Sequence, residues 1–354
     1  MTQRTIYYFF TRNATFIEKD LSMLREKYRV ITCAFPEAEK WKTPLLFIKQ
    51  IVFLLKHISS WKSATTICQF AGYHSFIPCL WAWIAGRPSI IVVGGTDCVS
   101  FPSLKYGHFQ NPLLALFTKL SYRFVKTVSA VHHSLFLRNN PYAGEKERHQ
   151  GILHFMPSAD FKQNEIPNGF DTDWFKILTP FEERPNYSFI SISVSLDDPI
   201  RLKLKGIDLI LELANRLPQA QFTLIGTKPN PMIKVPQNVH LVPYVPNPEL
   251  KNHYNKNRYY LQLSISEGFP NALCEAMACG CIPIVSDVAS MPQIVGESGS
   301  VLKHRDVEEL ASIISDRLQK QNESEISQAA SLSISERYSW NRRKKELWEM
   351  IEKG

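Results

Sequence analysis

The stretch "SEGFPNALCEAMACGCIPIVSD" (residues 266–287) decides the fold of this chain. It follows an apolar run and has Gly268 and Pro270 near its start. Residues of helical character continue as far as Gly280, and a second apolar run ends the stretch. This order of strand, loop, helix and strand is typical of a parallel α/β sheet, in which ligands bind beyond the carboxyl ends of the strands. The stretch therefore indicates both a fold class and the place of a ligand site.

Two glutamates flank the start of the predicted helix at 271–279. Glu267 precedes this helix, and Glu275 lies about one turn inside it. The amino end of a helix binds phosphate well, because its first N–H groups are unpaired and the positive end of the helix dipole lies there. Carboxylates accept hydrogen bonds from hydroxyl groups. The spacing therefore favours a phosphate ligand with polyols on either side. The alternative is a surface helix whose acids only complement its own dipole.

The same alternation of strands and helices runs along the whole chain. Strands are predicted at 5–10, 28–35, 65–70, 89–95, 127–133, 151–156, 188–195, 221–226, 239–245, 259–265 and 281–287, and helices at 14–26, 42–62, 76–86, 111–124, 206–217 and 271–279. We expect an α/β protein of two Rossmann-like domains facing across a cleft, at 1–164 and 165–337, with a helix at about 338–354 packed back on the first. Neither half carries the G-x-G-x-x-G fingerprint of nicotinamide dinucleotide binding.

Composition indicates a folded protein with an anionic partner. Hydrophobic residues make up 44% of the 354 residues, and 41 Lys and Arg against 33 Asp and Glu give a net charge of +8. This balance suits phosphates, nucleic acid or acidic lipid, although no recognition-helix or RNA motif supports nucleic acid. The seven cysteines lack paired zinc spacing, which favours reduced thiols. With no signal peptide or transmembrane segment predicted, we expect a cytoplasmic protein that can lie peripherally on the inner face of the plasma membrane.

The stretch at 266–287 resembles the E-x7-E signature of retaining glycosyltransferases with the GT-B fold, family 4 type (glycosyl transferases group 1). The family pattern ends in P-E-I-V, where this chain has Gln293 in place of the glutamate. Three further segments resemble family elements: "KGIDLILELANRL" (205–217), "LVPYVPNPEL" (241–250) and "IPNGFDTDWF" (166–175). The resemblance covers residues 165–310 well and the first 160 residues only in outline.

The resemblance implies transfer of a sugar from a UDP- or GDP-sugar to a saccharide or lipid-linked saccharide in cell-surface polysaccharide or lipopolysaccharide biosynthesis, without a metal or other cofactor. Glu275 would bind the ribose hydroxyls, Glu267 the donor sugar, and Lys205 the diphosphate, whose negative charge grows as it leaves. The backbone of the following residues would line the sugar, the diphosphate and the base: Gly268, Phe269, Pro270, Asn271, Tyr244 and Val245.

The family arginine that usually lies six positions before the lysine is missing. Ser195 stands at the expected strand end, and a longer loop, "SVSLDDPIRLKLKG", follows. Arg201 or Lys203 would supply the charge from this loop, and we favour Arg201 because its guanidinium binds phosphate through two hydrogen bonds. The alternative is that both are exposed loop cations.

The N-terminal half is expected to bind the acceptor. Gly94 stands where many family members have a histidine, so Asp97 is the preferred polar candidate in the acceptor site. His74, His132 and His133 also end predicted strands, and His133 is preferred because Ser134 beside it matches a strand-end serine of the family. The alternative for each isolated histidine is a structural role. Asp97 and His133, with Glu267, are thus the predicted catalytic residues.

Two further motifs bear on metals and membranes. "DTD" (171–173) mimics a metal-binding motif of another glycosyltransferase fold, but it belongs to the 166–175 element, and no His/Cys/Asp cluster offers another site, so no metal is expected. The helix at 42–62 carries Lys42, Lys49 and Lys56 on one face between Trp41 and Trp61. Together with residues 101–126, it predicts contact with an anionic membrane; the alternative is a packed helix with lysines at its rim.

Two rival functions remain open. The same architecture serves nucleotide-sugar epimerases, which change a nucleotide sugar without an acceptor. In the second rival function, the chain is a partner subunit that binds the donor but does not catalyse transfer. Three residues support it, because they stand where the family often has other, functional residues: Ser195, Gly94 and Gln293. The run of residues 266–287 is closer to the transferases than to the epimerases.

Overall fold

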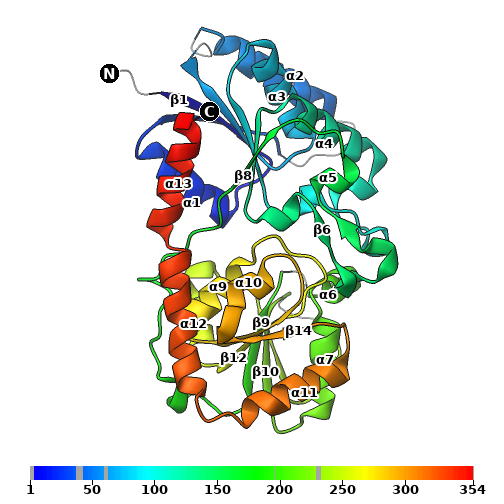
Figure 1. Ribbon diagram of the computed structural model, residues 1–354, viewed down its shortest axis with the longest axis vertical. Coiled ribbons are helices and arrows are strands. Elements are labelled where there is room, and N and C mark those ends of the chain that lie inside the picture. The colour runs from blue at the N-terminus through cyan, green and yellow to red at the C-terminus, as the bar shows by residue number, and fades with distance from the viewer. Residues whose placement is uncertain (1–3, 37–42, 60–62, 195, 229–232, 354) are drawn as a thin grey trace. The chain divides into compact units, whose positions relative to one another are not determined.

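The computed structural model describes residues 4–36, 43–59, 63–194, 196–228 and 233–353. The chain divides into two compact units, drawn as ribbons in Figure 1. Unit 1 comprises Met1–Arg138, His149–Pro167 and Asn341–Gly354, and unit 2 comprises Asn139–Arg148 and Asn168–Trp340. The predicted boundary at 164/165 lies close to the crossing at Pro167, whereas the assignment of 139–148 to unit 2 has no counterpart in the sequence pattern.

Unit 1 is built on a six-stranded parallel sheet in the order β2-β1-β3-β4-β5-β8. Its strands are β1 Thr5–Phe10, β2 Arg29–Ala34, β3 Thr65–Gln69, β4 Ser89–Val93, β5 Thr127–Ala130 and β8 Lys162–Glu165. Its helices are α1 Thr15–Arg25, α2 Thr43–Lys56, α3 Tyr73–Ile84, α4 Pro112–Phe124, α5 Ile152–Phe155 and α13 Trp340–Lys353. Short strands β6 Arg138–Asn139 and β7 His149–Gln150 pair with each other.

Burial on both faces explains why the central strands read as continuous apolar runs. Every residue of β1, β3 and β4 is buried. Figure 1 shows α1 and α13 on one side of this sheet and α2, α3 and α4 on the other. Strands covered on both faces need side chains such as those of Ile6, Ile67 and Ile91 at nearly every position.

The C-terminal helix α13 is fastened to α1 by a buried ion pair. Arg343 Nη2 lies 2.6 Å from Asp20 Oδ2, and its Nη1 donates to the carbonyl oxygen of Pro167 at 2.9 Å. Trp348 Nε1 donates to the carbonyl oxygen of Met23 at 3.0 Å. Residues at the two ends of the chain thus complete the same unit.

Unit 2 holds a second six-stranded parallel sheet, in the order β11-β10-β9-β12-β13-β14. Its strands are β9 Ser188–Ile192, β10 Gln221–Thr227, β11 Val239–Pro243, β12 Tyr259–Gln262, β13 Ile282–Ser286 and β14 Ser300–Leu302. Its helices are α6 Pro199–Leu204, α7 Ile207–Arg216, α8 Leu250–Tyr254, α9 Asn271–Ala278, α10 Met291–Val295, α11 Val307–Leu318 and α12 Glu323–Arg337. From β9, the next strands along the chain, β10 and β11, extend the sheet to one side, and β12, β13 and β14 extend it to the other. The topological switch point, where ligands bind in such sheets, therefore lies between β9 and β12.

Gly206 brings the start of α7 against the end of β12. Its φ is +70°, and a Cβ at this position would lie 2.1 Å from the carbonyl oxygen of Leu263. The N–H of Ile265 donates to the carbonyl oxygen of Leu204 at 2.8 Å, just before the glycine. Only glycine permits this approach, which holds Lys205 next to the loop that follows β12.

Replacing Gly206 with alanine is expected to destabilise unit 2 by about 3 kcal/mol or more, because main chain must move to admit the Cβ. Gly296→Ala is the matched control. Gly296 also has a positive φ, +52°, but nothing lies within 4 Å of its Cβ position, so we expect the smaller loss that backbone strain alone causes, about 1–3 kcal/mol. Urea unfolding of both variants measures the difference, and equal losses would refute the close approach.

The structure corrects four sequence predictions. The segment 151–156, predicted as a strand, contains the helix α5, which starts directly after Gly151. The sixth strand of unit 1, β8, was missed because its sequence KQNE is polar and mostly exposed at the sheet edge. The loop after β9 contains α6, and the helix predicted at 42–62 is α2, which ends at Lys56. Trp41, Lys42, Trp61 and Ser195 lie outside the described residues.

Candidate active site

The candidate site lies at the switch point of the unit 2 sheet. The loop 263–270 leaves the carboxyl end of β12 and leads directly into α9. Lys205, between α6 and α7, follows the neighbouring strand β9. In parallel sheets, ligands bind where two such loops diverge.

Glu267 is held by a cation and an amide. Lys205 Nζ lies 2.5 Å from Glu267 Oε1, and Gln262 Nε2 donates to the same oxygen at 3.0 Å. The Glu267 and Lys205 side chains are 12% and 25% exposed, so the pair is partly shielded but open to a ligand. The structure therefore brings together two predicted site residues that are 62 positions apart in the sequence.

Glu275 is buried inside α9 and has polar partners. Asn247 Nδ2 lies 2.9 and 3.0 Å from its two carboxylate oxygens, and the hydroxyl of Tyr254 lies 3.5 Å from Oε2. Burial, together with the nearby Glu275 carboxylate, raises the pKa of Tyr254 well above its usual value. Only 2% of Glu275 is exposed, so a ribose diol would have to displace the half-buried Asn247 to reach it.

The main chain at the start of α9 is fixed on both sides. Asn168 Nδ2 donates to Asn271 Oδ1 at 2.9 Å, and Ser290 Oγ donates to the carbonyl oxygen of Gly268 at 2.7 Å. Phe269 packs against Phe170, with ring centroids 6.3 Å apart. Pro270, the residue before the helix, has an extended backbone. The first N–H groups of α9 have no carbonyl partner within the helix, so this rigid turn presents them to an anion.

The other predicted donor residues are on the surface of unit 2. Arg201 and Lys203 are exposed on α6 instead of in the longer loop that the sequence predicted. Tyr244, whose N–H donates to the carbonyl oxygen of Thr227, is 67% exposed, and Val245 beside it is half-buried. These positions leave main-chain groups near residues 244 and 245 as the candidates for binding a base.

Asp171 has a local structural role. Its Oδ1 accepts hydrogen bonds from the N–H groups of Asp173 and Trp174, at 3.2 and 3.0 Å. A carboxylate that closes its own turn in this way is common in loops. Asp171 therefore stabilises the turn that contains the "DTD" motif.

Asp97, a predicted catalytic residue in unit 1, is fully buried. It lies in the turn after β4, and its carboxylate accepts hydrogen bonds from the N–H of Ala71 at 2.9 Å and the hydroxyl of Tyr122 at 3.3 Å. The side chain thus ties the loops after β3 and β4 together. This placement favours a positioning role over contact with an acceptor, which the sequence could not reveal.

Gly94 and His74 also have structural explanations. A Cβ on Gly94 would lie 2.6 Å from the ring of Phe70, so this ring takes the space that a larger side chain would need. His74 is 3% exposed, with Nε2 lying 2.7 Å from the carbonyl oxygen of Gln69. Burial lowers the pKa of His74 to about 4, so this histidine is neutral at physiological pH.

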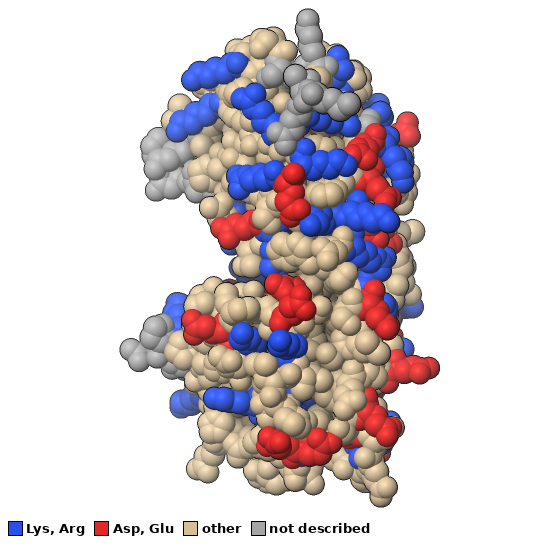
Figure 2. All heavy atoms as spheres, turned by 90° about the vertical axis from the view of Figure 1, so that its left-hand side faces the viewer, with Lys and Arg blue, Asp and Glu red and all other residues tan. Residues whose placement is uncertain are grey.

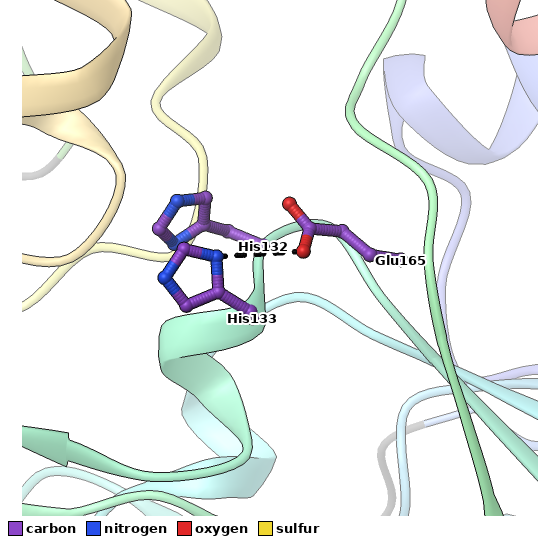
Figure 3. Close-up of side chains that lie close together, drawn as sticks. All are labelled: His132, His133 and Glu165. Carbon is purple, nitrogen blue, oxygen red and sulfur yellow. Dashed lines mark ion pairs between the residues drawn. The ribbon is translucent and has the colours of Figure 1, made fainter.

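His133 lies in a group that the sequence analysis did not recognise. It follows β5 with an exposed side chain, next to the buried His132, and its Nδ1 is 3.4 Å from Glu165 Oε2 (Figure 3). One nitrogen or oxygen atom of each residue lies within 4.8 Å of those of the other two. The sequence did not reveal this group, because β8, which supplies Glu165, was not predicted. The expectation that the protein needs no metal stays a prediction.

Three residues that contact predicted site residues were also missed: Asn168 beside Asn271, Asn247 beside Glu275 and Gln262 beside Glu267. Each is an amide that contacts a predicted site residue. Gln262 ends a strand and Asn247 follows a turn, positions that often carry function. Nothing in the linear sequence shows which amide reaches which glutamate, because these pairings depend on the sheet order.

Comparisons with known proteins find sequence similarity over part of the chain. Residues 199–320 match the family model described as Glycosyl transferases group 1. Over 97 residues the chain is 35% identical to the O-antigen chain mannosyltransferase B of Escherichia coli. This aligned region covers 27% of this chain and 26% of that protein. Over 95 residues it is 33% identical to the GDP-mannose:cellobiosyl-diphosphopolyprenol alpha-mannosyltransferase of Xanthomonas oryzae pv. oryzae, covering 26% and 25%. The chain thus matches about a quarter of each relative's length.

Similarity of fold extends over nearly the whole chain. The crystal structure of Anabaena HepE in complex with UDP-glucose has a TM-score of 0.70, covers 99% of this chain and 100% of that one, and is 14% identical in sequence. Both sheets described above are parallel and covered by helices, so the predicted fold class is confirmed. Residues 199–320 therefore match the glycosyl transferases group 1 family, within a chain that has the GT-B fold.

Proposed function

We propose that this protein transfers a sugar, with retention of configuration, from a UDP- or GDP-sugar to a saccharide or lipid-linked saccharide used in cell-surface polysaccharide synthesis. The observation that carries the proposal is the arrangement of Lys205, Glu267 and the buried Glu275 around the start of α9. It combines a cation and helix N–H groups for a diphosphate with carboxylates for the hydroxyls on either side.

Each group has a defined task in this reaction. The bond between the anomeric carbon and the diphosphate oxygen breaks, and the acceptor hydroxyl attacks the same face while its proton passes to the leaving phosphate. Lys205 and the N–H groups at the start of α9 stabilise the negative charge that gathers on the diphosphate. Glu267 holds the donor sugar and Glu275 the ribose. These roles require no metal or other cofactor, so donor binding is expected to persist in EDTA.

A thermal-shift screen over nucleoside diphosphates and their sugars tests the proposal. A ligand that binds only the folded protein raises its stability by about 2.7 kcal/mol at a hundred times the Kd. We expect UDP or GDP and one matching sugar to raise the melting temperature. Conversion of the nucleotide sugar without an acceptor would indicate an epimerase, and binding without hydrolysis or transfer would indicate a partner subunit.

The charge of unit 1 supports an anionic acceptor or membrane surface. Its sequence holds 23 Lys and Arg against 11 Asp and Glu, a net charge of +12, whereas unit 2 holds 18 against 22, a net charge of −4. Figure 2 shows such Lys and Arg side chains on the face of unit 1 that includes α13. The basic balance of the whole chain therefore comes from unit 1, which attracts anionic surfaces.

The helix α2 adds an apolar surface to this basic unit. The helix and the turn after it carry six exposed apolar residues, each with between 39% and 56% of its surface accessible: Leu45, Ile48, Ile51, Val52, Leu55 and Ile58. Lys49 and Lys56 are exposed on the same helix. Apolar side chains flanked by lysines suit the interface of an anionic membrane. None of the helices in the described residues is long and apolar enough to pass through a bilayer.

Substitution of Ile48, Val52 and Leu55 together by glutamine is expected to reduce binding to anionic vesicles at least tenfold, because each apolar side chain that enters the interface contributes about 1 kcal/mol or more. Flotation with phosphatidylglycerol-containing vesicles measures the effect. Leu332→Gln, which changes an apolar side chain of unit 2 that is 57% exposed, is the control. Absence of flotation by the unaltered protein would refute the membrane contact.

A further inference from the structure

Two adjacent strands of unit 1 bring three metal-binding side chains to one edge of the sheet. Glu165 is the last residue of β8, and it lies opposite Ala130, the last residue of β5. His132 and His133 follow Ala130 by two and three positions. Figure 3 shows the two imidazoles close together and the carboxylate directed toward them. The convergence follows from the parallel register, since both strands end at the same level.

The distances suit an ion held among these side chains. One ligand atom of each residue lies within 4.8 Å of those of the other two. His133 Nδ1 and Glu165 Oε2 are 3.4 Å apart, longer than the usual N–H···O hydrogen bond of about 2.9 Å. In a tetrahedral zinc site with bonds of about 2.1 Å, ligand atoms lie roughly 3.4 Å apart. This pair therefore already has the spacing of two ligands of one ion.

We propose that His132, His133 and Glu165 bind one divalent transition-metal ion of the zinc class. Two imidazoles and one carboxylate are typical ligands for such an ion and leave coordination positions for water or another oxygen ligand. The side chains of His133 and Glu165 are 66% and 34% exposed, so they can rotate toward an ion at little cost.

The buried His132 anchors this site. Only 4% of the residue is exposed, and its Nδ1 lies 2.8 Å from Ser134 Oγ and 3.3 Å from the N–H of Ser134. With Nδ1–H donating to Ser134 Oγ, the imidazole is oriented and its Nε2 is left for the ion. Acceptance by Nδ1 from the Ser134 N–H instead requires the proton on Nε2, so an ion selects the tautomer that donates to Ser134 Oγ. The ring of His133 lies against that of His132, with centroids 4.0 Å apart. One ordered ligand and two adjustable ones make a site that can close around an ion.

The three residues of this group belong to unit 1, whereas Lys205, Glu267 and Glu275 of the proposed donor site belong to unit 2. Metal binding can be measured without any sugar nucleotide, so its failure would leave the proposed transfer intact. The competing explanation is an ion pair between protonated His133 and Glu165, which needs no metal.

Titration of the chelator-treated full chain with Zn²⁺, in competition with a chromophoric chelator, distinguishes the two explanations. We expect one equivalent to bind tightly and the melting temperature to rise with it. His133→Ala and Glu165→Gln are each expected to weaken binding at least tenfold. The matched control is the double variant His149→Ala/His154→Ala, which removes another histidine pair of unit 1, with ring centroids 5.8 Å apart, that is not part of this metal-binding group.

Co²⁺ supplies an independent readout of the ligands. Its visible spectrum is expected to show a site of nitrogen and oxygen ligands without a thiolate charge-transfer band, since six of the seven cysteines are buried and burial raises the pKa of the Cys33 thiol to about 11. Circular dichroism checks that each variant is folded. Lack of one-to-one Zn²⁺ binding, equal affinity in folded Glu165→Gln, loss in the control variant, or a thiolate band would each overturn the proposal.

Discussion

Replacing Glu275 with alanine is expected to abolish the stabilisation of this protein by nucleoside diphosphate sugars and to weaken nucleotide binding at least a hundredfold. A carboxylate that accepts two hydroxyl hydrogen bonds contributes about 1.5–3 kcal/mol for each. The same change leaves the Asn247 amide without its buried partner, so some loss of stability is also expected. Isothermal titration calorimetry at a temperature where the variant is folded measures its nucleotide affinity separately from its loss of stability.

Glu323→Ala is the matched control for this experiment. Glu323 is another buried glutamate of unit 2, 7% exposed and paired with Arg317 at 3.2 Å, but it lies at the start of α12 instead of α9. We expect it to lower stability and leave nucleotide affinity unchanged. If both variants lost the same affinity, the effect of Glu275→Ala would reflect damage to the fold and the assignment of ribose binding would fall.

Replacing Lys205 with methionine is expected to lower kcat by about a hundredfold to a thousandfold, the range for loss of one group that stabilises a developing negative charge. Methionine keeps the length and apolar stem of the side chain and removes its charge. The effect on KM should be smaller, because the charge on the diphosphate is greatest in the transition state. Steady-state transfer assays with the donor identified by the thermal-shift screen measure both constants.

Lys203→Met separates Lys205 from its neighbours. Lys203 is an exposed lysine two residues earlier, on α6, and its loss is expected to change kcat less than threefold. Glu267→Gln should reduce kcat more than nucleotide affinity, because the Glu267 carboxylate is proposed to hold the sugar. A loss in Lys203→Met as large as that in Lys205→Met would assign the diphosphate to α6 instead.

The sequence predicted the fold best where burial gives a periodic signal. The strand at Thr5–Phe10 was predicted to the residue, and α7 and α9 to within one residue at each end. Prediction failed where hydrogen bonding or local turns, instead of burial, determine the structure. The polar edge strand β8 has no apolar pattern, and α5 has only four residues after a glycine with positive φ.

The sequence indicated candidate residues for the site but not their pairings. The E-x7-E spacing identified Glu267 and Glu275, and the "KG" element identified Lys205, but the 2.5 Å contact between Lys205 and Glu267 depends on the order of β9 and β12. The sequence could not show that the N–H of Ala71 and the hydroxyl of Tyr122 donate to the buried carboxylate of Asp97, and its catalytic role stays a prediction. The grouping of His132 and His133 with Glu165 was missed because it depends on β8, a strand that has no sequence signal.

The most direct test of the account is a crystal structure of this protein with its nucleoside diphosphate. We predict that the diphosphate oxygens lie within hydrogen-bond distance of the first N–H groups of α9 and of Lys205 Nζ, and that the ribose hydroxyls contact Glu275 in place of Asn247. A nucleotide bound elsewhere in the chain, or one bound here with Glu275 still paired to Asn247 alone, would contradict it.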